Sequence, residues 1–371
     1  MHQKSKAMEL NKESVINALR HVDDPDIKKD LVTLNMIRDV EVDGNKLSFT
    51  MVLTTPACPL KEVIKNSCLD AISEHIRPDI EVEINMTSDV TTTRDNTPLL
   101  PGVRNIIAVA SGKGGVGKST VTANLAVALA RQGAKVGIID ADIFGPSIPT
   151  MFNCENEQPS IRKEGEKNLI VPIEQYGVKL ISIGFLTPAD NAVVWRGPMA
   201  SSALKQFIAD TEWGDLDYLL IDLPPGTSDI HLTMVQTVPV TGAVLVTTPQ
   251  KVAIADAQKG LNMFLQPQIN VPVLGVIENM AFFTPEELPD NKYYIFGRDG
   301  GRKLAEKHNV PFLGEIPLIQ GIREGGDIGY PAIMQEGKTA DAFVSIAEAV
   351  AQQVAIRNAE KAETKKVELK I

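Results

Sequence analysis

The feature that most constrains this fold is a glycine-rich segment, Gly112 to Ser119, which matches the pattern G-x-x-x-x-G-K-[ST] in full. An apolar run, Ile106–Ala110, precedes it, and a helix is expected to begin near Lys118. In that setting the glycines let successive backbone N–H groups point at phosphate oxygens, and the helix N-terminus adds partial positive charge. The sequence therefore predicts a phosphate-binding loop between a strand and a helix.

From Asn105 onward, short apolar segments alternate with amphipathic ones. Continuous apolar runs are typical of parallel strands that are buried on both faces. Helices are expected between them, for example at Lys118–Arg131 and Ala253–Leu265. The alternation predicts an α/β fold with a doubly wound, mostly parallel sheet. The predicted strands are Ile106–Ala110, Lys135–Asp140, Val178–Ile183, Tyr218–Asp222, Ala243–Thr247, Val273–Glu278 and Phe312–Glu315.

The first ninety residues have a different pattern, which predicts a small α+β domain over residues 8–90. A hairpin is expected at Val40–Phe49, with Asp43 and Gly44 at its turn. The other expected elements are a helix at Asn11–Arg20, a helix at Pro59–Ile76 with Pro59 in its first turn, and a strand at Asp79–Met86.

Composition divides the rest of the chain. A segment rich in Thr, Asp and Pro predicts a linker over residues 91–103. The P-loop domain is expected over 104–357, followed by a charged and frayed tail over 358–371. Two domains suit a chain of 371 residues.

Bulk properties exclude several classes of function. A net charge of −10 argues against a general nucleic-acid binder, which needs a basic surface. The sequence contains no run of eighteen apolar residues, so no membrane span is predicted. The polar N-terminus lacks the apolar core of a signal peptide. Three scattered cysteines are too few for a disulfide framework. We therefore expect a cytoplasmic protein that binds neither membrane nor nucleic acid.

Acidic residues at two strand ends complete the predicted site, because ligand sites in open α/β sheets lie at the carboxyl ends of strands. Lys118 is expected to reach the β- and γ-phosphates, and Ser119 and Asp222 to hold Mg²⁺. Asp142 is a candidate for orienting or deprotonating the attacking water; for Asp142 and Asp140 the alternative is helix capping. The backbone N–H of Gly226 is a candidate sensor of the γ-phosphate.

A second lysine, Lys113, stands near the start of the loop, where an ordinary P-loop needs only one. It is either a solvated lysine on a loop or a second cation aimed at the triphosphate from a neighbouring subunit.

The motifs together resemble a known family. Lys113–Thr120 resembles the deviant Walker A of the MinD/ParA ATPases, and other segments of the P-loop domain resemble the Mrp/ApbC branch of that family. The N-terminal domain resembles that of iron–sulfur assembly factors, with Thr55-Pro56-Ala57-Cys58-Pro59 as its signature. The segments that resemble the Mrp/ApbC branch are Asp140–Ser147, Trp195–Met199, Asp222–Asp229 and Val276–Met280.

This resemblance implies a homodimeric carrier that binds and hydrolyses ATP and delivers iron–sulfur clusters, such as [4Fe–4S], to apoproteins. Its partners would be these apoproteins and iron–sulfur assembly factors. Lys113, Lys118 and Asp142 would be its catalytic residues, with Lys113 reaching nucleotide across the dimer interface. The nucleotide-binding residues would be Gly112, Lys113, Gly114, Gly115, Val116, Gly117, Lys118, Ser119, Thr120 and, near the adenine, Asn279.

One feature departs from the family pattern. Many members carry a Cys-x-x-Cys pair shortly after the Glu-Asn-Met motif, and thiolates are the usual cluster ligands. Here the corresponding stretch, Ala281–Asp290, has no cysteine. The aromatic residues around it, from 281 to 296, form either a partner-docking loop or a packed lid.

Cys58 is then the candidate cluster ligand. With Pro59 in the first helical turn it is expected near the N-cap, where the helix terminus and Lys61 would lower the thiol pKa. The alternative is a partly buried cysteine without chemical consequence. Cys68 lies ~15 Å further along the same predicted helix, in an apolar series, and is expected in the core. Cys154 has no predicted role, and His231 is expected to be structural.

Two other functions remain to be weighed. A MinD/ParA-like switch would use ATP to dimerise on membrane or DNA, but the C-terminal tail mixes glutamates with its lysines. An electron donor resembling the nitrogenase reductase would need paired cysteines in the P-loop domain, and that domain has only Cys154.

Overall fold

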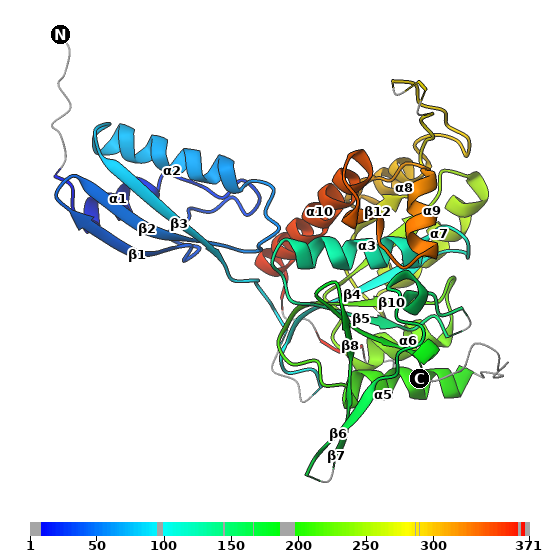
Figure 1. The fold of residues 1–371 in the computed structure, drawn as a ribbon. Coiled ribbons are helices and arrows are strands. Elements are labelled where there is room, and N and C mark those ends of the chain that lie inside the picture. Colours follow the sequence, from blue (N-terminus) through cyan, green and yellow to red (C-terminus); the bar gives the residue numbers. More distant parts are fainter. Residues whose placement is uncertain are drawn as a thin grey trace. The chain divides into compact units, whose positions relative to one another are not determined.

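The computed structural model describes residues 9–94, 99–143, 145–165, 167–185, 197–285, 287–288, 290–362 and 365–367. The predicted motif residues Phe144, Trp195 and Arg196 and the linker residues 95–98 lie outside the described residues. The chain divides into two compact units, Met1–Thr91 with Ala355–Lys361, and Thr92–Val354 with Ala362–Ile371 (Figure 1).

The first unit is a three-stranded sheet with two helices packed against it. The strand order is β1-β2-β3; β1 and β2 pair antiparallel, while β2 and β3 pair parallel. The inward side chains Leu47, Phe49 and Met51 of β2 pack against the helices. The elements are α1 (Lys12–Leu19), β1 (Ile37–Asp43), β2 (Lys46–Leu53), α2 (Lys61–His75) and β3 (Glu81–Ser88).

The predicted hairpin is confirmed, but its turn lies one residue further on. Asp43 pairs with Lys46, so that Gly44 and Asn45 form the two-residue loop. Gly44 has φ +60°, a left-handed conformation that such turns require.

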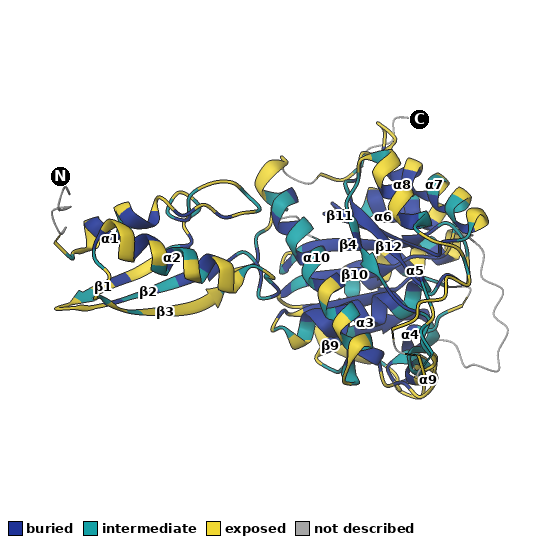
Figure 2. Cartoon of the chain, turned by 90° about the horizontal axis from the view of Figure 1, so that it is seen from above, coloured by how far each residue is buried: buried dark blue, intermediate teal, exposed yellow. Residues whose placement is uncertain are grey.

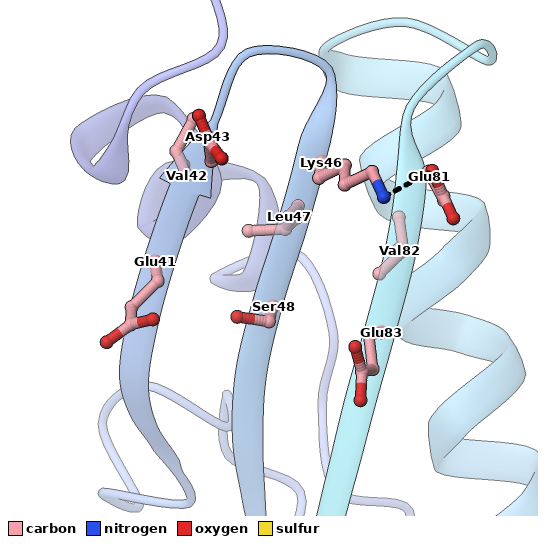
Figure 3. A pocket seen from close by; sticks show the side chains of 9 residues that line it. All are labelled: Glu41, Val42, Asp43, Lys46, Leu47, Ser48, Glu81, Val82 and Glu83. Carbon is pink, nitrogen blue, oxygen red and sulfur yellow. Dashed lines mark ion pairs between the residues drawn. The ribbon is translucent and has the colours of Figure 1, made fainter.

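The outward side chains of the same sheet are polar and mostly acidic (Figure 3). Glu41, Ser48 and Glu83 are register neighbours across the three strands, and a second row joins Asp43 to the ion pair of Lys46 and Glu81 (3.6 Å). Because the helices pack only against the other face of the sheet, these two rows of polar and charged side chains remain solvated.

The second unit is built on an eight-stranded sheet in the order β13-β12-β11-β4-β10-β5-β9-β8. Only the β8–β9 pair is antiparallel, and Figure 2 shows the central strands as buried. All seven predicted strands and the doubly wound α/β class are confirmed. The strands are β4 (Val103–Ser111), β5 (Val136–Asp140), β8 (Ile173–Gln175), β9 (Val178–Ser182), β10 (Leu216–Asp222), β11 (Gly242–Thr247), β12 (Val273–Glu278) and β13 (Phe312–Glu315).

Helices connect these strands. Among the described residues none is long and apolar enough to cross a bilayer. An exposed hairpin, β6 (Ser160–Glu164) and β7 (Lys167–Val171), was not predicted (Figure 1). The helices are α3 (Lys118–Arg131), α4 (Ile148–Met151), α5 (Gly197–Asp210), α6 (Asp229–Thr237), α7 (Lys251–Leu265), α8 (Gly300–His308), α9 (Gln320–Asp327) and α10 (Lys338–Glu360), with 3₁₀ turns η1 (Ile183–Phe185) and η2 (Ala332–Met334).

The strand order brings three chain segments to one edge of the sheet. β10 lies between β4 and β5, and its last residue, Asp222, is the register partner of Asp140 on one side and of Val109 on the other. The carboxyl ends of these three parallel strands therefore meet beside the glycine-rich loop that follows β4.

The prediction of a frayed C-terminal tail is wrong in part. Helix α10 continues to Glu360, beyond the expected end at 357. Further on, the N–H of Val367 donates to the carbonyl of Val235 (3.0 Å), and the Val367 side chain packs against the core of the second unit. Val367 is therefore attached to α6.

Candidate nucleotide site

The glycine-rich loop lies between the end of β4 and the start of α3, where it was expected. Gly115 and Gly117 have φ of 79° and 81°, left-handed values that side chains with a Cβ rarely adopt. Gly112 lies against the backbone of α7, and a Cβ there would be 2.1 Å from the carbonyl carbon of Asp256. Both backbone conformation and close packing thus require glycine in this loop.

Lys118, the first residue of α3, places its amine between two carboxylates. Its Nζ is 2.8 Å from Oδ2 of Asp222 and 3.6 Å from Oδ2 of Asp142, and the residue is only 5% exposed. A phosphate group entering the loop would offer this cation a competing set of anionic oxygens. The buried amine of Lys118 is therefore placed to exchange its contact with a carboxylate for a contact with phosphate.

Two hydroxyls of α3 hold Asp222. Ser119 donates to its Oδ2 at 2.6 Å, and Thr122 donates to its Oδ1 at 2.7 Å. A serine hydroxyl beside a carboxylate is the hard-oxygen donor set that Mg²⁺ prefers, so Ser119 and Asp222 fit the predicted metal role. Thr122 was missed from the sequence, although its i, i+3 spacing from Ser119 places both on one helix face.

The two carboxylates at and just after the end of β5 face different ways. Asp140 is fully buried, and both its oxygens accept hydrogen bonds from protein groups. Burial raises the pKa of Asp140, and the nearby Asp222 raises it further. Asp142 lines the cavity of the loop with its side chain 14% exposed; burial raises its pKa, while Lys118 opposes that shift. Asp142 is therefore the one positioned toward a bound phosphate.

Asn279, which follows β12, contacts the loop directly. Its Nδ2 donates to the carbonyl of Val116 at 2.8 Å, and the same nitrogen would lie 2.3 Å from a Cβ at Gly117. Gly226 is engaged differently from expectation, because its N–H donates to the carbonyl of Ser111 (2.8 Å). Sensing a γ-phosphate through this N–H would require that bond to break.

The loop encloses a cavity of ≈ 200 Å³. Ligand pockets usually measure ~300–1,000 Å³, so this cavity accommodates the phosphates while the remainder of a nucleotide extends beyond it. Lys113 and Thr120 line the cavity together with Ser147, Met151 and Pro225.

The predicted start of the second helix, with Pro59 in its first turn, is wrong, although Cys58 still lies near the N-cap. Helix α2 begins at Lys61 with Leu60 at its N-cap, so Cys58 and Pro59 lie in the turn before the helix. Cys58 is half-buried, whereas Cys68 and Cys154 are buried, and burial raises the pKa of each of those two thiols to about 12. Within the described ranges no group of three or more His, Cys, Asp or Glu side chains is placed to hold a metal ion.

In the aromatic segment after Asn279, backbone pairing joins two exposed side-chain positions. Phe283 and Tyr293 exchange two N–H···O bonds of 2.8 Å, yet their side chains are 37% and 47% exposed. Of the two alternatives for this segment, the packed lid is not supported.

His231 lies in the first turn of α6, close to the site, and is 1% exposed. Its Nδ1 accepts a hydrogen bond from the N–H of Ser228 (3.1 Å). The pKa of His231 is lowered to about 4, mainly by burial, and the charge of Lys118 acts in the same direction. The imidazole is therefore neutral in the folded protein.

This burial predicts a loss of stability in acid. Between pH 6.5 and 4 the unfolded chain binds a proton at His231 that the folded protein does not, so the free energy of unfolding should fall by about 3 kcal/mol as pH decreases through that window. In His231→Gln, glutamine keeps an acceptor for the Ser228 N–H but does not titrate. Urea unfolding of both proteins at several pH values measures the difference; equal pH dependence would contradict the prediction.

Comparison with known proteins agrees with this geometry. Residues 102–354 match the family model described as NUBPL iron-transfer P-loop NTPase, and residues 12–84 match that of an iron–sulfur cluster assembly protein. An iron–sulfur cluster carrier protein from Synechocystis is 46% identical over 352 residues, which cover 94% of this chain and 99% of that protein. The Escherichia coli K12 protein of the same name is 42% identical, covering 95% and 93%.

A solved structure is also similar to this chain. The nucleotide-binding protein from Archaeoglobus fulgidus, in complex with ADP, is 41% identical and superimposes with a TM-score of 0.54, covering 62% of this chain and 88% of that one. The chain therefore belongs to the family of iron-transfer P-loop NTPases that includes the iron–sulfur cluster carrier proteins, and it is an ATP hydrolase of the P-loop class.

Proposed function

We propose that the chain binds and hydrolyses ATP with Mg²⁺ and couples this to the transfer of an iron–sulfur cluster to apoproteins. One observation carries the proposal. A phosphate loop with Lys118 between two carboxylates occurs in the same chain as an iron–sulfur assembly domain. Neither domain alone would connect nucleotide chemistry to a cluster.

In this proposal each residue around the loop has a defined task. Lys118 exchanges its contact with Asp222 for the β- and γ-phosphates, and Asp142 orients the attacking water. Ser119 and Asp222 hold Mg²⁺, which neutralises phosphate charge. Backbone N–H groups of Gly112–Thr120 cradle the phosphates, and Asn279 lies near the adenine.

The proposed active form is a homodimer. Lys113 lines the cavity but is only half-buried within one chain. In the dimer it would reach the nucleotide of the partner subunit and add a cation where negative charge develops. A cavity that encloses only the phosphates is consistent with a site completed by a second copy.

We further propose that residues 8–90 form the cluster-handling domain, 91–103 the linker, 104–357 the ATPase domain and 358–371 the tail. Cys58 is the proposed ligand of a [4Fe–4S] cargo, since the other two thiols are buried. Apoproteins and assembly factors would be the partners, in the cytoplasm. No observation favours a MinD/ParA-like positioning switch over this carrier.

Anaerobic reconstitution tests the cluster role of Cys58. We expect the wild type to acquire the visible absorbance of a cluster and pass it to an apo-acceptor, while Cys58→Ser loses both, because serine offers no thiolate. Cys154→Ala is the matched control: its thiol is buried and it should load normally. Equal loading of wild type and Cys58→Ser would remove Cys58 from the site.

A further inference from the structure

Asp140, at the end of β5, is fully buried and accepts three hydrogen bonds. Its Oδ1 accepts from the N–H of Asp142 (3.2 Å). Its Oδ2 accepts from the N–H of Ile148 (3.3 Å) and from the hydroxyl of Ser182 (2.9 Å). Both oxygens are thus occupied by donors of the protein.

Two of these donors bracket one loop. Asp142 stands at its start, and Ile148 is the first residue of α4, where a helix N–H lacks an intrahelical partner. A single carboxylate therefore holds both ends of the segment that carries Asp142 into the cavity and also brings Ser147 to its wall.

The third donor ties this arrangement to the sheet. Ser182 is the last residue of β9, and its hydroxyl oxygen also accepts from the N–H of Gly184 at 3.0 Å. On the other side of Asp140, the N–H of Ala141 donates to the carbonyl of Asp222 at 2.9 Å. The start of the loop is anchored to β10 and, through Asp140 and Ser182, to β9.

We propose that Asp140 is a positioning residue for ATP hydrolysis, holding the backbone at Asp142 and Ile148 so that the carboxylate of Asp142 faces Lys118. The inference rests on the proposed role of Asp142. Asp140 itself does not touch the cavity; it acts through two backbone N–H groups. An asparagine at 140 would keep one acceptor oxygen and turn an N–H₂ group toward a donor, so at least one end of the loop would be released.

The test compares Asp140→Asn with a matched control in the same sheet. Asp217, near the amino end of β10, also accepts a backbone hydrogen bond, from the N–H of Lys135 (2.9 Å). Asp217→Asn therefore removes the same chemistry far from the loop. Ser182→Ala removes only one of the three donors and serves as a milder variant with an intact carboxylate.

We expect kcat for ATP hydrolysis to fall ~10²-fold in Asp140→Asn, the size of effect that a misplaced catalytic group produces. KM for ATP should stay within about twofold, because the phosphate loop is unaltered. The fall in kcat should be several-fold smaller in Ser182→Ala than in Asp140→Asn. The kcat of Asp217→Asn should equal that of the wild type.

Hydrogen exchange supplies a readout that does not depend on activity. The amides of Asp142 and Ile148 should exchange ~10-fold faster or more in Asp140→Asn than in the wild type, since each has lost or weakened an acceptor. They should exchange normally in Asp217→Asn. Unchanged exchange and kcat in Asp140→Asn would overturn the inference.

The two proposals fail separately. If Asp142→Asn hydrolyses ATP at the wild-type rate, the catalytic role proposed for Asp142 is wrong. This holds even if amide hydrogen exchange shows that Asp140 holds the loop. If Asp142→Asn is inactive but Asp140→Asn and Ser182→Ala are both fully active, Asp142 keeps its role and Asp140 loses the one inferred for it.

Discussion

Lys118→Ala is expected to lower the rate of ATP hydrolysis by ~10³-fold, because it removes the cation that would stabilise charge developing on the transferred phosphate. The 2.8 Å contact of Nζ with Asp222 shows that the amine already lies at the strand ends where the phosphates would bind. Mg²⁺-dependent release of phosphate from ATP, measured at saturating nucleotide, checks this result.

The same substitution should also destabilise the protein. Asp222 is fully buried, and removing one partner of a buried ion pair costs about 3–5 kcal/mol. Thermal unfolding and circular dichroism must therefore accompany the assay, to separate lost chemistry from lost fold. Lys179→Ala is a suitable control, since that amine donates to the carbonyl of Trp213 (2.8 Å), away from the loop. Hydrolysis at the wild-type rate in folded Lys118→Ala would refute the assigned site.

Asp142→Asn is expected to reduce kcat by ~10²–10⁴-fold while KM for ATP changes little, as removal of a base that acts on the attacking water should do. The carboxylate lies 3.6 Å from the amine of Lys118 and lines the phosphate cavity. Single-turnover hydrolysis, together with binding of a non-hydrolysable ATP analogue, separates the chemical step from nucleotide affinity.

Asp327→Asn provides the control for this second substitution. Asp327 is an exposed carboxylate of α9 that pairs with Arg323 at 2.6 Å, outside the site. Its loss should leave hydrolysis unchanged. An unaltered kcat in Asp142→Asn would instead show that this carboxylate takes no part in the chemical step.

The sequence predicted the fold well wherever local pattern and final environment coincide. Several of the seven predicted strands are continuous apolar runs, and the central strands of such a sheet are buried on both faces. The start of α2 was placed too early because proline suits both a first helical turn and the turn that precedes a helix. The attachment of Val367 to α6 could not be predicted from local pattern, because its partner Val235 is distant in the sequence.

The chemistry of the site divides in the same way. By itself, the sequence determined the phosphate loop, because its glycines, Lys118 and Ser119 lie within eight consecutive residues and act through local backbone geometry. The tertiary structure alone decided which way the two carboxylates after β5 point, that Thr122 holds Asp222, and that two of the three thiols are buried. Thr122 and Asp222 are 100 positions apart, and Asn279 and Val116, which also meet at the site, are 163 positions apart. These contacts depend on the order and register of the strands, which no local pattern of residues encodes.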